Sequence, residues 1–295
     1  MEKEQVIRDF LDRYGEDEYF LRDIKQKFTN WLSNVDDINV ESTLIKLFSE
    51  FRFFSKLEIK LILKEQILMV FDSNNKKDLC IFPLKPNGIG SNSSDEMTMW
   101  VREIFREEEI TTYKDTINTD LSRLGKDESI KTLVFFDDIS GSGGTIVKFL
   151  EDKELNLKGK QIIINLIIIT EEALEKINSY KSIQKDFDIK INYKYKVDKV
   201  FINNEKFDHN DFNAVFELEK EIWGEKHRNI LGYEDSQLII GFSHNIPNNT
   251  LSCFWYHIDF KGKKQNWNTL FKRSTQLRRK NSQNNFILNQ NKSKG

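Results

Sequence analysis

The residues best suited to chemistry stand in one stretch, LVFFDDISGSGGTIVKFL, at Leu133–Leu150. Two adjacent acids, Asp137 and Asp138, follow an apolar run, and three of the chain's 13 glycines come soon after them. Carboxylates accept hydrogen bonds from hydroxyl groups, and glycines let the backbone approach an anion closely. Ser142 and Thr145 add hydroxyl donors. This combination indicates a ligand with a phosphate at one end and a polyol close by.

The elements around this stretch must place the acids and the glycines at one edge of a sheet. TLVFF is typical of a buried strand, and the apolar residues Ile146–Leu150 continue as a helix. Ligands of open α/β sheets bind at the carboxyl ends of the strands, and a helix start favours phosphate. A ribose 5-phosphate unit fits, with the acids on its hydroxyls and the loop Ser140–Gly144 on its phosphate. An ordinary strand–turn–helix with a solvated acid pair is the alternative.

Two common nucleotide motifs do not fit the same stretch. A P-loop has a lysine directly after its glycines, and no lysine follows Gly144 directly. In the dinucleotide-binding fingerprint the acid comes about 20 residues after the glycines, whereas here the acids precede them.

Strands and helices alternate through the middle of the chain. Leu79–Leu84 and Ile162–Ile169 are typical of buried strands, and residues 189–197 alternate as a strand with one wet face does. A capping-box pattern at Ser93–Glu96 predicts the start of a helix that reaches Phe105. This order predicts an α/β fold with a parallel sheet.

The two ends of the chain differ from this middle part. Apolar residues at helical spacing predict a helical region over residues 1–73, followed by an α/β domain over residues 74–272. Residues 273–295 are basic and rich in Asn and Gln, which predicts a disordered tail. The cluster Arg278–Lys280 is either part of a solvated end or a contact for nucleic acid.

Composition limits the class of protein. The chain has 295 residues, of which 38% are hydrophobic and 31% charged, and its formal net charge is −2. This is a globular balance without a general attraction to nucleic acid or anionic membranes. Cys80 and Cys253 lie in apolar surroundings, which argues against a disulfide framework or a cysteine metal site. With a charged start and no membrane-spanning run, a soluble cytoplasmic protein is expected; the oligomeric state is not indicated.

The stretch LVFFDDISGSGGT resembles the signature of type I phosphoribosyltransferases at every position of Leu133–Thr145. The resemblance implies a parallel sheet flanked by helices, here with an N-terminal helical extension, and a transferase of the glycosyltransferase class. It implies that Asp137 and Asp138 hold the ribose hydroxyls of phosphoribosyl pyrophosphate, together with Mg²⁺ on its ribose and pyrophosphate. The residues that would surround the 5-phosphate are Gly141, Ser142, Gly143, Gly144 and Thr145.

A second loop stands where this family grips pyrophosphate. Lys85–Asn92 follows the first predicted strand of the sheet, and the resemblance makes Lys85, Asn87 and Gly88 its candidate ligands. An ordinary strand-to-helix connection is the alternative. The polar residues Glu109–Ser129 fall where such enzymes keep a mobile loop over the reaction, and the cations there are Lys114, Arg123 and Lys126.

The late stretch GFSHNIPNNTLSCFWY, at Gly241–Tyr256, is similar to phosphoribosyltransferase-like proteins of bacterial conflict systems, including retron-associated ones. This resemblance implies an antiphage effector, with a reverse transcriptase or nucleic-acid complex as a partner. His244 is then a candidate acid or base among Asn245, Asn248 and Asn249. The alternative is a turn built by Pro247 and the asparagines.

The acceptor is not readable from the sequence. Salvage enzymes for 6-oxopurines carry an acid where Gly141 stands, so that substrate class is disfavoured. The expected activity is transfer of a phosphoribosyl group to a nitrogen nucleophile. The alternatives are an inactive sensor of a phosphoribosyl nucleotide and a structural subunit of a retron-type complex.

Overall fold

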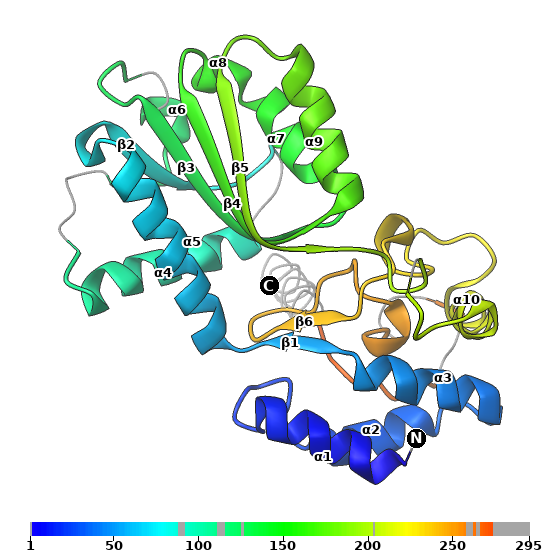
Figure 1. The fold of residues 1–295 in the computed structure, drawn as a ribbon. Helices are drawn as coiled ribbons and strands as arrows, with labels where there is room; N and C mark the ends of the chain where they lie inside the picture. The colour runs from blue at the N-terminus through cyan, green and yellow to red at the C-terminus, as the bar shows by residue number, and fades with distance from the viewer. Residues whose placement is uncertain are drawn as a thin grey trace, which may run out of the picture. The chain divides into compact units, whose positions relative to one another are not determined.

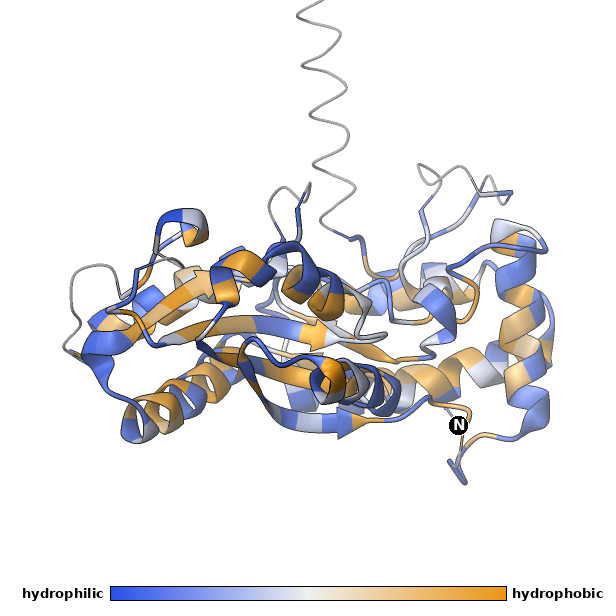
Figure 2. Ribbon diagram, turned by 90° about the horizontal axis from the view of Figure 1, so that it is seen from above, coloured by the Kyte–Doolittle hydropathy of each residue, from blue (hydrophilic) through white to orange (hydrophobic). Residues whose placement is uncertain are grey.

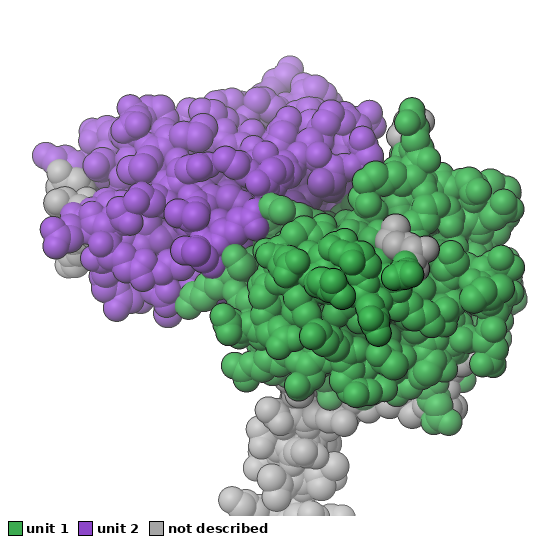
Figure 3. Space-filling view, turned by 60° about the horizontal axis from the view of Figure 1, so that its bottom comes forward, with its two compact units in different colours: residues 1–56, 199–295 green, residues 57–198 purple. Residues whose placement is uncertain are grey.

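The computed structural model describes residues 2–87, 92–110, 116–124, 127–202, 204–257, 262–263 and 266–273. The chain divides into two compact units, which Figure 3 colours separately. Unit 1 combines residues 1–56 with residues 199–295, and unit 2 is residues 57–198. Each unit is described by itself below. This division into packed units falls at other positions than the domain boundaries expected after residues 73 and 272, which stay predictions.

Unit 2 is built on a parallel sheet with the strand order β2-β3-β4-β5 (Figure 1). The strands are β2 (Leu79–Pro83), β3 (Thr132–Ser140), β4 (Gln161–Thr170) and β5 (Asp188–Val197). The two middle strands are buried along nearly their whole length, and Figure 2 shows the hydrophobic residues that line them. A strand between two neighbours and under helices on both faces must be apolar on both sides. The predicted α/β fold with a helix-flanked parallel sheet is confirmed.

Helices cover both faces of this sheet (Figure 1). On one face, α7 (Gly144–Asp152), α8 (Glu154–Leu157) and α9 (Glu171–Ile183) share a core with the strands. The helices α4 (Lys56–Ser73) and α5 (Ser93–Glu107) cover the other face. The remaining helical segments of unit 2 are the short η1 (Lys76–Asp78) and α6 (Leu121–Leu124).

A hydrogen bond from the second half of α4 shows why packing assigns this helix to unit 2. The side-chain N–H of Gln66 donates to the main-chain oxygen of Leu166, in the middle of β4, at 2.8 Å. Gln66 is 5% exposed, so the bond forms in a dry environment where an unpaired amide is costly. Sequence periodicity groups α4 with the helices before it. It cannot reveal the contact with β4, because that contact joins positions 100 residues apart.

Unit 1 contains both ends of the chain. Its helices are α1 (Lys3–Tyr14), α2 (Ile24–Leu32), α3 (Ile38–Ser49) and α10 (His209–Trp223). Two short parallel strands, β1 (Arg52–Phe54) and β6 (Ile240–Phe242), pair between its N-terminal and C-terminal parts. The short turns η2 (Tyr233–Asp235) and η3 (Ser252–Phe254) complete its described elements. An aromatic core fills the unit, and the indole N–H of Trp31 donates to the carbonyl of Cys253 at 2.7 Å.

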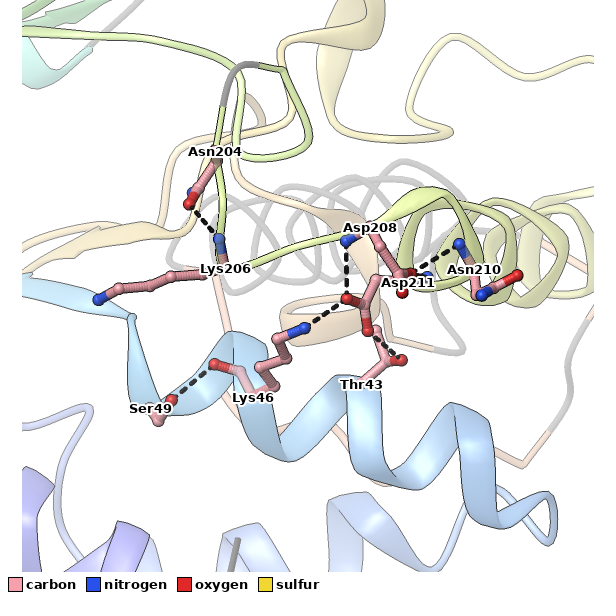
Figure 4. A network of polar contacts seen from close by, with 8 residues as sticks. All are labelled: Thr43, Lys46, Ser49, Asn204, Lys206, Asp208, Asn210 and Asp211. Carbon is pink, nitrogen blue, oxygen red and sulfur yellow. Dashed lines mark hydrogen bonds and ion pairs between the residues drawn. The ribbon is translucent and has the colours of Figure 1, made fainter.

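One buried carboxylate joins α3 to α10 in this unit (Figure 4). Asp211 accepts hydrogen bonds from Thr43 Oγ1 at 2.9 Å, from Lys46 Nζ at 2.5 Å and from the N–H of Asp208 at 3.0 Å. Asp208 in turn caps α10 by accepting from the N–H groups of Asn210 and Asp211. The N-terminal helices are therefore held by a residue that comes far later in the chain.

No helix among the described residues is both long enough and apolar enough to cross a membrane.

Candidate functional site

The two acids lie inside β3, near its carboxyl end. Asp137 is 7% exposed and Asp138 is 2% exposed. Asp137 Oδ1 accepts from Ser93 Oγ at 2.6 Å and from the N–H of Asp138 at 3.0 Å. Asp138 Oδ1 accepts from the N–H of Ile139 at 2.8 Å. The strand continues beyond the predicted run TLVFF because its pairing with β4 extends as far as Ser140.

Burial and mutual repulsion control the charge of this pair. Burial, and after it the charge of Asp138, raise the pKa of Asp137 well above its usual range. Two neighbouring carboxylates in a dry site are stabilised by a cation or by hydroxyl donors. Among the described residues, no group of three or more His, Cys, Asp or Glu side chains could hold a metal ion by itself.

The glycine loop directly after β3 has a shape that other residues would disturb. Gly143 has a φ of +70°, and a Cβ there would lie 3.0 Å from the carbonyl oxygen of Ala173. Glycine adopts this left-handed backbone without strain. The hydroxyl of Thr170 donates to the carbonyl of Gly141 and accepts from the N–H of Ala173 at 3.1 Å. The loop is thus fixed to the start of α9.

The backbone N–H groups of this loop are available to a ligand. Within the part of the chain that the structure describes, no acceptor is bonded to the N–H groups at positions 142–146. They stand at the start of α7, where the helix dipole adds partial positive charge. Ser142 is partly exposed and Thr145 is exposed, so their hydroxyl groups are accessible as well. Such a row of donors is suited to an anion.

Lys176 on α9 lies beside the same loop and was not predicted from the sequence. A Cβ at Gly144 would lie 3.6 Å from Lys176 Nζ, and one at Gly143 would lie 3.3 Å from Lys176 Cβ. Lys176 forms no ion pair with a described residue. The order of elements could have predicted it. The helix α9 starts at the carboxyl end of β4, next to β3, so a lysine in its first turns comes close to the glycine loop.

The start of α5 connects the acid pair to the neighbouring strand. The helix begins at Ser93, and Asp95 accepts from the N–H of Asn92 at 3.0 Å. The capping box is therefore Asn92–Asp95, one residue earlier than the predicted Ser93–Glu96. Ser94 Oγ accepts from the N–H of Leu84 and donates to the carbonyl of Phe136, both at 2.6 Å. These two bonds bring the ends of β2 and β3 to one helix turn.

The structure does not bring all the predicted pyrophosphate ligands to the start of α5 beside the acid pair. Lys85 Nζ forms a 2.6 Å ion pair with Asp95 Oδ1, in the first turn of α5. The N–H of Asn87 donates to Asp152 Oδ2 at 2.8 Å, and its side chain accepts from Lys153 Nζ at 2.5 Å. Asp152 ends α7, so Asn87 lies about 12 Å along that helix from the phosphate loop, at a rise of about 1.5 Å per residue. Gly88 lies outside the described residues.

The connection before β3 is described only in part. Thr116–Asn118 runs beside β2, with Ile117 bridged to Ile81, and α6 follows. The Arg123 side chain lies 3.9 Å from Asp120, one turn away on the surface. Lys114 and Lys126 lie outside the described residues. A mobile loop over the reaction stays a prediction.

His244 belongs to unit 1, whereas the acid pair belongs to unit 2. It follows β6, in a turn closed by backbone hydrogen bonds between Phe242 and Asn245 at 2.9 and 3.1 Å. The carbonyl groups of Asn248 and Asn249 accept from the N–H groups of Tyr233 and Leu238. This part of the late stretch forms turns through its backbone, as the alternative interpretation expected, and the acid or base role of His244 stays a prediction.

A buried acid supports the late stretch, and sequence reasoning missed it. Glu219 on α10 is 0% exposed and accepts from the N–H groups of Cys253 at 2.7 Å and Leu231 at 2.6 Å. Burial raises the pKa of Glu219 to about 7. Glu219 lies at helical spacing with the buried apolar residues Val215 and Ile222 of α10, and this spacing was the sequence feature that indicated its burial.

Comparison with known proteins gives one family. A family model described as PRTase-CE matches residues 28–273. The match includes the acid pair, the glycine loop and the late stretch around His244. No curated protein matches the chain.

Proposed function

The chain belongs to the PRTase-CE family, which is phosphoribosyltransferase-like, and from this premise we propose that it binds phosphoribosyl pyrophosphate with Mg²⁺. The observation that carries the proposal is the arrangement on β3: two buried acids are followed at once by a loop of unpaired N–H donors. A ribose 5-phosphate offers hydroxyl groups for the acids and a dianion for the loop. The reaction proposed is transfer of the phosphoribosyl group to a nitrogen nucleophile.

The phosphate end of the substrate would occupy the loop. The N–H groups at positions 142–146 and the hydroxyl of Thr145 would donate to its oxygen atoms. Lys176 adds a full positive charge, which the family signature itself does not supply. A charge-assisted hydrogen bond of this type is worth about 1.5–3 kcal/mol, so Lys176 would contribute a substantial share of the affinity.

The ribose end would lie on Asp137 and Asp138. Their carboxylates would accept from the ribose hydroxyls, and Ser93 would hold Asp137 in position through its 2.6 Å hydrogen bond. Mg²⁺, bound with the substrate, would neutralise charge on the pyrophosphate and the ribose oxygens. Binding of this cation would then lower the raised pKa of Asp137.

For catalysis, the residues around the departing pyrophosphate would have to rearrange. Lys85 is paired with Asp95, so it would have to exchange this partner for pyrophosphate during the reaction. An enzyme must stabilise the departing pyrophosphate more than the bound substrate. The same ion pair favours the second candidate function, a sensor that binds the phosphoribosyl group without turnover.

The biological role proposed is antiphage defence, with a reverse transcriptase or nucleic-acid complex as partner. It is supported by the resemblance of residues 241–256 to proteins of conflict systems. A plaque assay in cells that carry the chain with its neighbouring genes tests this role; unchanged phage titres with the intact locus and with Asp137→Asn would refute it.

The binding proposal is tested by thermal unfolding with phosphoribosyl pyrophosphate and Mg²⁺. The ligand should raise Tm because it binds the folded state only. Asp137→Asn with Asp138→Asn should abolish the rise, whereas Asp188→Asn, an equal change at an exposed position, should preserve it. A full response of the double variant would refute the ribose assignment.

Turnover separates the enzyme from the sensor. Lys85→Ala should reduce pyrophosphate release with an extract as acceptor source far more than it reduces binding. If the wild-type chain binds tightly and no acceptor gives release above the Asp138→Asn background, the sensor function is correct.

A further inference from the structure

A cavity lies within unit 1, and none of the residues assigned above lines it. Its volume is about 490 Å³, and two chain segments and one further residue form it: residues 19–27, His257 and residues 267–272. Two hydrogen bonds fix the later segment to Asn34, which follows α2. Asn34 Nδ2 donates to the carbonyl of Asn268 at 2.9 Å, and the N–H of Asn268 donates to Asn34 Oδ1 at 2.8 Å. The cavity is therefore built by packing between distant parts of the sequence.

Positive charge dominates the lining of this cavity. The ionisable groups are Arg22, Asp23, Lys27, His257 and Lys272, so three permanent cations face one carboxylate. Neither Arg22 nor Lys272 forms an ion pair with a described residue. Lys27 Nζ donates to the carbonyl of Phe20 at 3.3 Å, and burial lowers the pKa of Lys27. Each of these groups would be stabilised by an anion in the cavity.

The same lining holds an unused neutral donor. Trp267 is 7% exposed, and its indole N–H has no partner among the described residues. Buried donors in folded proteins are nearly always bonded, so an orphan beside a cavity calls for an explanation. A ligand oxygen that reached this donor would supply the missing acceptor.

An aromatic ring is exposed at the same cavity. Tyr19 is 54% exposed and meets the ring of Phe20 edge-on, at 5.3 Å between centroids and an interplanar angle of 76°. Tyr19 lines the cavity, and stacking on exposed aromatic rings tolerates every nucleobase. A simple carboxylate or inorganic phosphate would contact the cations but has no planar group that could stack on this ring.

We propose that this cavity binds a nucleotide, with its phosphate on Arg22, Lys27 and Lys272 and its base on Tyr19. The nucleotide is either a free mononucleotide or one unit of a single strand, and both share this chemistry. The cavity shares no residue with the phosphoribosyl site, and the proposal stands whether or not the chain is a transferase.

Calorimetric titration of the full chain tests the proposal with deoxyadenosine 3′-monophosphate. This probe has no 5′-phosphate, so it cannot occupy the glycine loop as a ribose 5-phosphate would. Lys27→Ala should weaken its binding by about tenfold or more, the usual loss for a charge-assisted hydrogen bond. Lys25→Ala is the matched control, because it removes an exposed lysine of the same helix that does not line the cavity.

Further variants protect the test against misfolding and assign the base. Lys272→Ala should repeat the effect of Lys27→Ala if the latter variant does not fold. Tyr19→Ala should weaken binding of the nucleotide by about fivefold or more but leave inorganic phosphate unaffected, since stacking contributes about 1–3 kcal/mol per base. Equal losses for both probes would overturn the base assignment.

A ten-residue oligothymidylate separates the two sources of nucleotide. Binding that is much tighter than that of the mononucleotide and falls steeply with salt indicates a strand. Comparable binding of both probes indicates a free nucleotide. No binding of either probe to the wild-type chain, or an equal loss in Lys25→Ala and Lys27→Ala, would overturn the proposal.

Discussion

Asp138→Asn should make the unliganded protein more stable at neutral and alkaline pH. The substitution keeps the shape of the side chain and the oxygen that accepts from Ile139, but it removes the charge next to Asp137. Each unit by which a neighbouring charge raises a pKa corresponds to about 1.4 kcal/mol. For this buried pair we expect a gain on the order of 1 kcal/mol at pH 8, which is about 2 °C in Tm for a chain of 295 residues.

The sign of the pH dependence follows from the raised pKa. A carboxyl group whose pKa is raised on folding contributes stability below its unfolded pKa, and this contribution is lost as pH rises through the folded pKa. The wild-type chain therefore carries more of the penalty of the pair as the pH rises through the raised pKa of Asp137. The advantage of Asp138→Asn should shrink as the pH is lowered.

Thermal unfolding without ligand, measured from pH 5 to pH 8.5, gives the result directly. Asp188→Asn is the control for a lost surface charge and should show no such trend. A variant that is less stable than wild type at every pH, or whose advantage does not grow with pH, would refute the electrostatic account of the pair.

Three further predictions test other parts of the molecule. Gly143→Val should abolish the Tm response to phosphoribosyl pyrophosphate and destabilise the chain by about 1–3 kcal/mol, because a side chain meets Ala173 at a positive φ; calorimetry and urea unfolding measure the two effects. Lys176→Ala should weaken the same ligand about tenfold in calorimetry, while Lys181→Ala, on the exposed side of α9, leaves it unchanged. Burial raises the pKa of Glu219 to about 7, so wild-type stability should fall by roughly 1–3 kcal/mol relative to Glu219→Gln between pH 5.5 and 8 in urea titrations. A constant difference between these two chains would contradict the third prediction.

The sheet and the acid pair could be predicted because their signals are local. An apolar run that is buried on both sides, as Ile162–Ile169 is, can hardly form anything but a central strand. The two acids and the glycines that follow them are consecutive in the sequence, so their common position at the sheet edge follows once the strand is known. The loop conformation at Gly143 also has a local cause.

The supporting residues could not be predicted because their contacts are not local. Ser93 reaches Asp137 across 44 positions, and Lys176 reaches the loop from the helix after the next strand. Nothing in the composition around Lys85 indicates that its partner would be Asp95, since both residues are ordinary surface types. Periodicity assigns residues to a helix face but does not say which other element that face will meet.

The joining of α3 to α10 through Asp211 has a consequence for synthesis on the ribosome. Unit 2 is continuous in sequence, so its sheet can form as soon as residues 57–198 have left the exit tunnel. The first helices of unit 1 emerge earlier but lack Asp211, β6 and the later aromatic residues that bury them. They must wait, with apolar surface exposed, while the whole of unit 2 is made. Ribosomes stalled after residue 198 has left the tunnel, but before Asp211 and β6 have emerged, should therefore carry a folded sheet domain together with an N-terminal segment open to chaperones and proteases.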